Sequence, residues 1–348
     1  MRLALAPYRL YFKHPFGTAH GLRDGTDSVF VRIEHNGFVG YGEATLPPYL
    51  DETQQSVLEE LRTMGLDEQL RLLEGGAVDV LNSLSQPARA ALTTAYYDLM
   101  SRQRTTSVSM LLTGHVKQQR PDRALTMMTL GHSALKDIPT KLKELPASDI
   151  LKVKLGSDHD IATLRAVLCA DQRPLFLDAN QGWTTIAEAM TALEVVGQTR
   201  LVGLEQPFAK ERLDLHRELR QQGVDRLYGD ESVQNATDLE RAADAFTGIN
   251  VKLMKCGGLD RALELIGRAR ELGMSVMLGS MSESSLGCAA MAQLAATADL
   301  LDLDGPWLIA NDPFTGLAMV AGELAFEHPL GIGVRPVEAV LQWSILGA

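Results

Sequence analysis

From about residue 125 onward the chain repeats a short apolar run that ends in a polar or small residue, and this repeat constrains the fold more than any other feature. Segments with apolar residues at helical spacing, such as 260–272, lie between the runs. The runs end at Lys154, Asp178, Glu205, Asp230, Lys252, Gly279 and Asp304, 22 to 27 residues apart. Each interval fits one strand, one helix and two short loops. With the run near 125–130, eight such units predict a (β/α)8 barrel, although spacing alone also allows a doubly wound parallel sheet.

The first part of the chain is organised differently. Residues 27–35 alternate apolar and polar side chains, Asn36-Gly37 is a tight-turn signal, and residues 38–43 fit the second strand of a β-hairpin. Helices are predicted from about Thr53 and from about Ser85, which is a suitable N-cap residue. Strands followed by helices without strict alternation indicate a small α+β unit before the barrel.

The composition of the chain excludes several classes of protein. Lys and Arg number 33 and Asp and Glu number 44, so the formal net charge is 33 − 44 = −11. Such a chain is expected to bind neither nucleic acid nor an anionic membrane surface. We see no signal-peptide core and no apolar run of the roughly 18 residues that span a bilayer. The three cysteines, Cys169, Cys256 and Cys288, lack metal-ligand spacing, so we expect buried thiols in a reducing, cytoplasmic compartment.

Carboxylates close three consecutive predicted strands. The carboxyl ends of barrel strands meet at one mouth, where catalytic residues lie. A single terminal Asp is explained by a helix N-cap, but Asp178, Glu205 and Asp230 would converge and raise one another's pKa. A hard divalent cation relieves this repulsion, and oxygen ligands suit Mg²⁺. The pattern therefore predicts one Mg²⁺ per chain, with Mn²⁺ as the alternative metal.

Lysines lie on the strands that flank these carboxylates. Lys152 and Lys154 point to the same side of one strand, and Lys252 ends the strand after the one that carries Asp230. One interpretation is that the lysines only balance the carboxylates. The other is that crowding of cations and partial burial lower the pKa of a lysine until it acts as a base. A base on one face of a bound substrate and an acid on the other would allow inversion of a carbon centre.

Six short motifs, taken in the order in which they occur along the chain, resemble those of the muconate-lactonising branch of the enolase superfamily. They are Lys-x-Lys (152–154), Asp-Ala-Asn (178–180), Glu-Gln-Pro (205–207), Asp-Glu-Ser (230–232), Lys-Leu-Met-Lys-Cys-Gly-Gly (252–258) and Asp-Leu-Asp-Gly-Pro (302–306). Within that branch the chain looks most like the dipeptide epimerases, of the L-Ala-D/L-Glu type. The resemblance covers essentially the whole chain. It implies an α+β capping domain over residues 1–118, an enolase-type (β/α)8 barrel over 119–324 and a C-terminal segment, 325–348, that returns to the capping domain.

The resemblance also implies a reaction. It is the metal-dependent epimerisation of a dipeptide at the Cα next to its C-terminal carboxylate, through a Mg²⁺-stabilised enediolate. Carried over position by position, the acid/base residues would be Lys154 and Lys252. The metal ligands would be Asp178, Glu205 and Asp230, with Lys255 and Glu231 behind them.

The remaining implied residues would bind the substrate. Lys152 would lie near the substrate carboxylate, and the Asp302/Asp304 pair would receive the α-ammonium, with a helix cap plus a buried Asp as the alternative. Arg23, on the loop 14–23 that also contains His20, would pair with an acidic side chain or remain a solvated loop residue. Ser280 and Glu283 are expected to line the mouth, with Glu283 near Lys252.

Other activities remain open at this point. An o-succinylbenzoate synthase or an N-acylamino-acid racemase would use the same ligands and lysines, and a non-catalytic barrel that binds a small ligand is a more distant alternative. Among dipeptides, L-Ala-D-Glu derived from peptidoglycan is the default substrate by resemblance. A small-molecule substrate is the only partner implied, and a homo-oligomer is compatible with the sequence.

Overall fold

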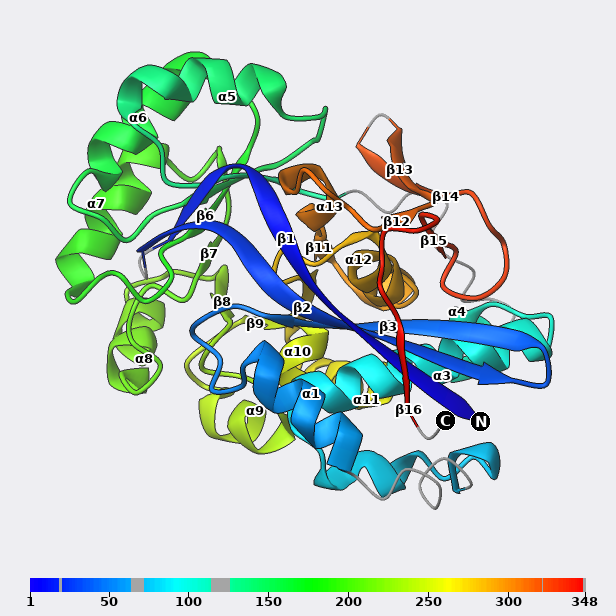
Figure 1. Ribbon diagram of the computed structural model, residues 1–348. Helices are drawn as coiled ribbons and strands as arrows, with labels where there is room; N and C mark the ends of the chain where they lie inside the picture. Colours follow the sequence, from blue (N-terminus) through cyan, green and yellow to red (C-terminus); the bar gives the residue numbers. More distant parts are fainter. Residues whose placement is uncertain (19–20, 64–71, 114–125, 321, 347–348) are drawn as a thin grey trace.

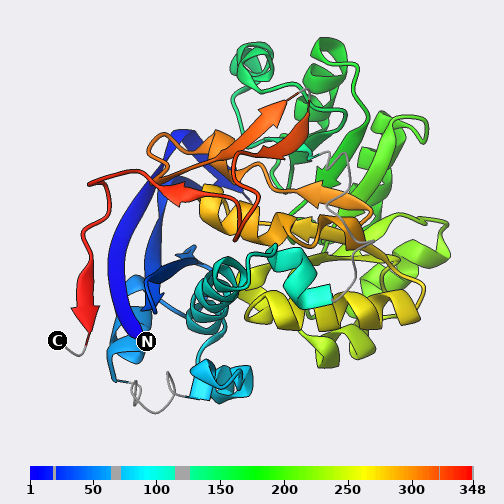
Figure 2. The ribbon, with the colours of Figure 1, turned by 90° about the vertical axis from the view of Figure 1, so that its right-hand side faces the viewer.

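The computed structural model describes residues 1–18, 21–63, 72–113, 126–320 and 322–346. Figure 1 shows a long antiparallel sheet, in blue, beside an α/β barrel made by the middle of the chain, in green to orange. The last strand returns to the blue sheet, and the two termini lie close together in both views (Figures 1 and 2). The predicted fold class is therefore confirmed, whereas the boundaries at 118/119 and 324/325 stay predictions.

The antiparallel sheet is built on the predicted hairpin. Its two turn residues, Asn36 and Gly37, have φ of 50° and 79°, the positive values that a two-residue hairpin turn requires. The sequence pattern does not indicate the N-terminal strand, because Pro7 and charged residues interrupt it. The fold tolerates Pro7 because only residues 3–5 of that strand pair with a second neighbour. In spatial order the sheet contains β16 (Ser344–Leu346), β1 (Arg2–Thr18), β2 (Gly21–His35) and β3 (Phe38–Leu46).

The helices of the capping domain begin where the sequence predicts. Ser85 occupies the N-cap position of the long helix, but its hydroxyl donates to Glu60 Oε2 at 2.5 Å instead of capping the helix. Met64, expected on the apolar stripe of the first helix, lies outside the described residues. The described helices here are α1 (Gln54–Thr63), the 3₁₀ helix η1 (Val78–Ser83), α3 (Gln86–Gln103) and α4 (Val108–Thr113).

Helix α3 packs directly on strand β3. A Cβ atom at Gly40 would lie 2.0 Å from the carbonyl oxygen of Ala95, and one at Gly42 would lie 1.9 Å from that of Ala91. Only glycine allows the two backbones to approach this closely. The close contact buries α3 between the sheet and the barrel, where the side chains of Ala88, Leu92 and Leu99 are also buried.

Eight parallel strands follow in consecutive order around the barrel, and all eight correspond to the predicted runs. The first and last strands are joined through Met127 N, which donates to Leu301 O at 2.9 Å, and through a bridge between Thr126 and Leu301. This nearly closed arrangement excludes the doubly wound sheet. The strands are β4 (Met128–Leu130), β5 (Leu151–Lys154), β6 (Leu175–Asp178), β7 (Leu201–Glu205), β8 (Leu227–Gly229), β9 (Gly248–Val251), β10 (Ser275–Gly279) and β11 (Leu300–Asp302).

The barrel is filled by side chains and surrounded by helices. Inside it, Met127, Phe176, Tyr228 and Met277 form a small buried cluster, with the Phe176 and Tyr228 rings 5.3 Å apart in an edge-to-face contact. The described helices between and after the strands are η2 (Leu135–Asp137), α5 (Ile138–Glu144), α6 (Asp160–Ala170), α7 (Ile186–Val196), α8 (Leu213–Gln221), α9 (Ala236–Ala242), α10 (Leu253–Cys256), α11 (Leu259–Glu271), α12 (Ser285–Ala292), η3 (Ala295–Thr297) and α13 (Gly305–Leu308). Four short strands end the chain before β16: β12 (Phe314–Thr315), β13 (Leu317–Val320), β14 (Glu323–Phe326) and β15 (Arg335–Pro336).

Buried polar contacts fix the capping domain on the barrel. Arg89 of α3 is 1% exposed and donates to both carboxylate oxygens of Asp260, at 3.0 and 2.7 Å. Glu43 of β3 is also 1% exposed and accepts hydrogen bonds from Ser284 and from Gly287 N at the start of α12. The loops on the barrel mouth are therefore held in part by residues more than 150 positions away.

Two smaller expectations are tested by the fold. Cys256 and Cys288 are buried free thiols as expected, but Cys169 is exposed, because it lies on the solvent side of α6 opposite the buried residues Leu164 and Val167. Within the described ranges, we find no helix that is both long enough and apolar enough to cross a bilayer.

Candidate active site

The register of the parallel strands brings the predicted polar residues together at the barrel mouth. Lys154 on β5 lies opposite Asp178 on β6, and Asp178 lies opposite Glu205 on β7. Asp230 follows the last residue of β8, and Lys252 follows the last residue of β9. The fold therefore gathers the two lysines and the three carboxylates at one end of five neighbouring strands.

Lys152 lies at the centre of this cluster. Its side chain is fully buried, and its Nζ is 2.6 Å from Glu205, 2.6 Å from Asp302 and 3.0 Å from Asp178. Lys154 Nζ lies nearer the opening and donates to the same Asp178 oxygen at 2.6 Å. One buried amine thus holds carboxylates from three strands, and a second amine borders the opening.

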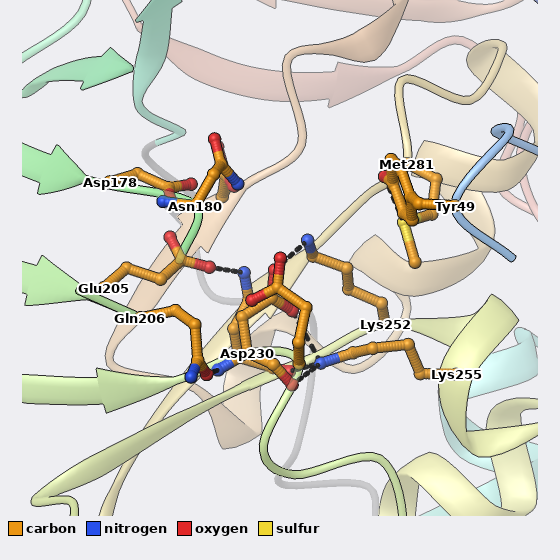
Figure 3. A network of polar contacts seen from close by, with 12 residues as sticks. Tyr49, Asp178, Asn180, Glu205, Gln206, Asp230, Lys252, Lys255 and Met281 are labelled. Atoms are coloured by element: carbon orange, nitrogen blue, oxygen red, sulfur yellow. Dashed lines mark hydrogen bonds and ion pairs between the residues drawn. The ribbon is translucent and has the colours of Figure 1, made fainter. Parts of the chain in front are cut away.

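A second group of contacts surrounds Asp230 (Figure 3). Lys252 Nζ donates to Asp230 Oδ2 at 2.8 Å, and Lys255 Nζ donates to Oδ1 at 2.7 Å. Lys255 also donates to the carbonyl oxygens of Asp230 and Asn250, both at 2.7 Å, so its position is fixed. The Gln206 side chain accepts from Asp230 N at 3.0 Å and therefore joins the end of β7 to the end of β8.

The lysine pKa values differ from the sequence expectation. Burial alone would lower the pKa of Lys252, but the carboxylates of Asp230 and Glu205 outweigh it and raise that pKa well above its usual value. The pKa of Lys152 is raised in the same way, against its own burial, by Asp178, Asp302 and Glu205. The predicted lowering by crowded cations is wrong for these two lysines, because each amine lies closer to carboxylates than to another amine.

The same buried charges also shift the pKa values of the carboxylates. Lys152 and Lys154 lower the pKa of Asp178 below its ordinary value although the group is buried. Burial and the charge of Asp178 raise the pKa of Glu205 to about 7. Burial and the charge of Asp230 raise the pKa of Glu231 to about 8. The lysine amines therefore do not compensate all of the negative charge at the mouth.

A cavity opens among these residues, between the barrel mouth and the capping domain. Lys154 and Lys252 both line it, from strands on either side of β6, β7 and β8. Arg23 and Tyr49 of the capping domain border it as well. The other lining residues are Thr129, Asn180, Asp230, Glu231, Ser280, Met281, Ser282, Asp302, Asp304 and Leu308.

Asp302 and Asp304 border the cavity from the last barrel strand and the turn after it. Asp302 Oδ2 accepts from Lys152, and Asp304 Oδ2 accepts from the backbone N–H of Thr129 at 2.7 Å. Burial, followed by the charge of Asp302, raises the pKa of Asp304 to about 7. Asp304 is thus a buried carboxylate whose described hydrogen bonds come from the neutral groups of Thr129, and it is a suitable partner for a cation that enters the cavity.

The loop residues have different positions. Arg23 lies over the rings of Phe12 and Tyr49, 5.6 Å from each centroid, and borders the cavity. Ser280 also borders the cavity, but Glu283 does not. Glu283 Oε2 accepts a hydrogen bond from Met281 N within its own loop, so the expectation that Glu283 lines the cavity is corrected. Glu283 nevertheless lies close enough to Lys252 for the two charges to interact. His20 lies outside the described residues.

The residues present suit a hard divalent cation. Among the described residues, no three Asp, Glu, His or Cys side chains lie close enough together to hold a metal ion. The reason is that the carboxylates at the mouth are paired with lysines. Two buried oxygens at the mouth, Asn180 Oδ1 and Glu231 Oε2, have no hydrogen-bond partner among the described residues. Uncompensated carboxylates together with unpartnered amide and carboxylate oxygens form a donor set of the type that Mg²⁺ prefers.

Several lining residues are not indicated by strand-end spacing. Asn180 lines the cavity, whereas the side chain of Gln206 holds the backbone of Asp230. Both belong to quoted motifs, and their positive φ values of 45° and 35° identify a strained backbone of the kind found at functional sites. Ser282, with φ of 65°, lies in a similar turn. Tyr49 reaches the cavity from the capping domain and donates to Met281 Sδ at 3.1 Å. The Pro47-Pro48 turn before it is the only local signal.

Family models cover both parts of the chain. Residues 6–113 match the mandelate racemase/muconate lactonizing enzyme N-terminal domain, and residues 141–340 match the enolase C-terminal domain-like family.

Known proteins resemble the chain over nearly its full length. It is 36% identical to an L-Ala-D/L-Glu epimerase of Bacteroides thetaiotaomicron, over 97% of this chain and 88% of that one. It is 31% identical to an L-Ala-D/L-amino acid epimerase of Flavobacterium johnsoniae, over 96% and 99%. The structure of a dipeptide epimerase from Enterococcus faecalis, complexed with Mg and L-Leu-L-Tyr, superimposes with a TM-score of 0.84 at 28% identity, over 96% and 98%. The strand-end motifs, the barrel with its capping domain and these matches agree, and the chain belongs to the mandelate racemase/muconate lactonizing enzyme family of the enolase superfamily.

Proposed function

We propose that this protein is a dipeptide epimerase, an isomerase that inverts the Cα next to the C-terminal carboxylate of its substrate. The observation that carries the proposal is the position of Lys154 and Lys252. Both amines line one cavity, from strands on either side of three carboxylate-bearing strands. Inversion of a carbon centre needs a proton acceptor on one face and a proton donor on the other, and binding alone needs neither.

A divalent cation is part of the proposal. Asp178, Glu205 and Asp230 would hold it, and Mg²⁺ fits the donor set, as it does in the complexed relative from Enterococcus faecalis. When bound, the cation would polarise the substrate carboxylate and so acidify the adjacent Cα–H, and it would compete with the lysines for their carboxylate partners. Lys255 keeps Asp230 in place, because its Nζ donates both to the backbone carbonyl and to the side-chain carboxylate of Asp230.

The lysines then divide the proton transfer. One of Lys154 and Lys252, as the neutral amine, removes the Cα proton, and the other, as the ammonium, donates a proton to the opposite face. Lys152 stays charged in its buried position and stabilises the negative charge that develops on the substrate carboxylate. The two roles exchange when the substrate has the other configuration.

The two ends of the dipeptide have separate partners. Asp302 and Asp304 would receive the α-ammonium at one side of the cavity. Arg23 would pair with an acidic C-terminal side chain, which makes Ala-Glu the first substrate to test. Since the relatives that are 36% and 31% identical are epimerases of L-Ala-D/L-Glu and of L-Ala-D/L-amino acids, the synthase and N-acylamino-acid racemase alternatives are not favoured.

The cellular compartment and the natural substrates are also part of the proposal. Three free thiols, one of them exposed, suit a reducing compartment, and we place the protein in the cytoplasm. The proposed substrates are dipeptides that end in glutamate, such as the L-Ala-D-Glu released from peptidoglycan.

The proposal is tested by incubating the Mg²⁺-loaded protein in D₂O with a library of dipeptides that includes both epimers of Ala-Glu. We expect a gain of one mass unit and a change of configuration at the C-terminal residue, both abolished by a chelator and restored by added Mg²⁺. A protein that exchanges no Cα proton in any dipeptide is not a dipeptide epimerase.

A further inference from the structure

A second cavity lies beside the catalytic one. It is enclosed by the distal part of β1, the end of β4, helix α5 and helix α13, and it holds about 150 Å³. Its apolar lining consists of Pro15, Leu130, Leu145, Pro146, Trp307 and Leu308. Proteins with an apolar cavity of about this volume bind benzene in it, so the space suits a branched aliphatic or aromatic side chain.

The two cavities share a wall at the end of the site proposed for the substrate ammonium. Thr129 and Leu308 line both cavities. The backbone N–H of Thr129 donates to Asp304 Oδ2, so the second cavity begins next to that carboxylate. In a dipeptide, the Cα that carries the ammonium also carries the N-terminal side chain. A substrate whose ammonium lies at Asp304 therefore has its first side chain at the entrance of the second cavity.

Four charged or titratable side chains also line this cavity: an exposed lysine, Lys13, and three residues that have partners of their own, His14, Lys141 and Glu144. His14 Nε2 contacts Glu144 Oε2 at 2.7 Å, and Lys141 Nζ donates to Ser133 Oγ at 2.9 Å. Both side chains of the first pair are about half exposed, so this contact lies at the outer edge. A largely apolar lining, with charges that are either paired or exposed, favours an apolar occupant over a charged one.

We infer that this second cavity is the subsite for the N-terminal side chain, and that the preferred substrates have a large apolar first residue, of the Leu-Glu, Met-Glu or Phe-Glu class, rather than alanine. The inference rests on the proposed function. The methyl group of alanine would leave most of the cavity unfilled, whereas a leucyl or phenyl group fills it. A hydrophobic pocket discriminates by about 10- to 200-fold for one missing methylene, so the preference is large enough to measure.

The test compares kcat/KM for Leu-Glu and Ala-Glu with the Mg²⁺-loaded, full-length protein, from initial rates of Cα deuterium incorporation. We expect at least about a tenfold preference for Leu-Glu. Leu145→Trp, which fills the cavity from its half-buried wall, should reduce the ratio to near one. Trp307→Ala, which removes part of the wall, should also lower the ratio if the first variant folds poorly. Leu272→Trp, at a 50% exposed leucine after α11, is the matched control and should leave the ratio unchanged.

The outcomes separate the two proposals. Exchange of Ala-Glu as fast as Leu-Glu, or a ratio that both cavity variants leave unchanged, overturns the subsite and leaves the epimerase proposal standing. Faster exchange of N-acetyl-Ala-Glu than of Ala-Glu also overturns it, because an acyl group would then be the occupant. Absence of exchange with every dipeptide removes the proposed function and the subsite with it.

Discussion

Replacing Lys252 with alanine is the sharpest test of the two lysine roles. If Lys154 and Lys252 work on opposite faces of the same Cα, the variant retains the base for one epimer but lacks the proton donor that completes its inversion, and it lacks the base for the other epimer. We therefore expect Lys252→Ala to exchange the Cα proton of one epimer of Ala-Glu without inverting it, and to be inactive on the other. Lys154→Ala should show the reverse preference.

The size of the effect follows from the contacts. General acid or base catalysis contributes about 10²- to 10⁴-fold, so the lost exchange should fall by at least about a hundredfold. The structural cost should be small, because Asp230 loses the contact to Lys252 at 2.8 Å but keeps Lys255 at 2.7 Å and is not left without a cation. We expect a loss in the free energy of unfolding of about 1.5–3 kcal/mol, the usual range for one hydrogen bond to a charged group.

The assay follows deuterium incorporation by mass spectrometry and configuration by chiral chromatography, separately for L-Ala-L-Glu and L-Ala-D-Glu. Lys136→Ala, which removes an exposed lysine beside α5, is the control and should behave as the unsubstituted protein. Equal losses toward both epimers in each variant, with the fold and Mg²⁺ binding intact, would refute a division of labour between the two lysines.

Arg23, Asp304 and His216 give three further predictions. Arg23→Gln should lower kcat/KM for Ala-Glu by about 30-fold or more, the range for loss of one partner of a buried charge pair, and should affect Ala-Leu much less; equal losses would place Arg23 outside the side-chain site. Because burial and Asp302 raise the pKa of Asp304 to about 7, Asp304 is mostly protonated at pH 6, so KM for Ala-Glu should fall as the pH rises from 6 to 7.5 and become high and flat in Asp304→Asn. Burial lowers the pKa of His216 to about 4 from 6.5, so its contribution to stability is present above pH 6.5 and is lost as the pH falls through 4. The loss is about 3 kcal/mol at 1.36 kcal/mol per pKa unit, and urea unfolding should show a correspondingly weaker acid dependence in His216→Leu.

The barrel could be predicted from the sequence because its strands are short runs made mostly of apolar residues, and most of these runs end at or just before a polar residue. Although the alignment of Asp178 with Glu205 also depends on a one-residue register shift after Leu175, the parallel order of the strands by itself predicts that Lys154, Asp178 and Glu205 are neighbours. Asp302 and Asp304 could be placed near the first strand for the same reason, since the barrel closes between β4 and β11.

Details that depend on side-chain direction could not be predicted. Glu283 turns back to the N–H of Met281 instead of facing the cavity, a local choice that no spacing encodes. Tyr49 meets Met281 across 232 positions of the chain, at a junction that exists only in the folded protein. The direction of the lysine pKa shifts depends on ion-pair distances of 2.6 to 3.0 Å, whereas the sequence reveals only that cations and carboxylates are neighbours.

The charges at the mouth indicate what the liganded site must contain. The four lysine amines at positions 152, 154, 252 and 255 pair with the four carboxylates at positions 178, 205, 230 and 302. Glu231 and Asp304 are in excess, since neither has a lysine or arginine within ion-pair distance in the described part of the chain, and both have raised pKa values. A bound divalent cation adds two positive charges. The dipeptide adds one positive charge at its ammonium and one negative charge at its reacting carboxylate, and Arg23 balances the negative charge of a glutamyl side chain. With all four lysines protonated and all six carboxylates ionised, the complete site is then neutral, and it carries one net negative charge once Lys154 or Lys252 is the neutral amine that removes the Cα proton. An N-acylated dipeptide would lack the ammonium and leave Asp304 uncompensated, so the same count explains why a free amino terminus should be required.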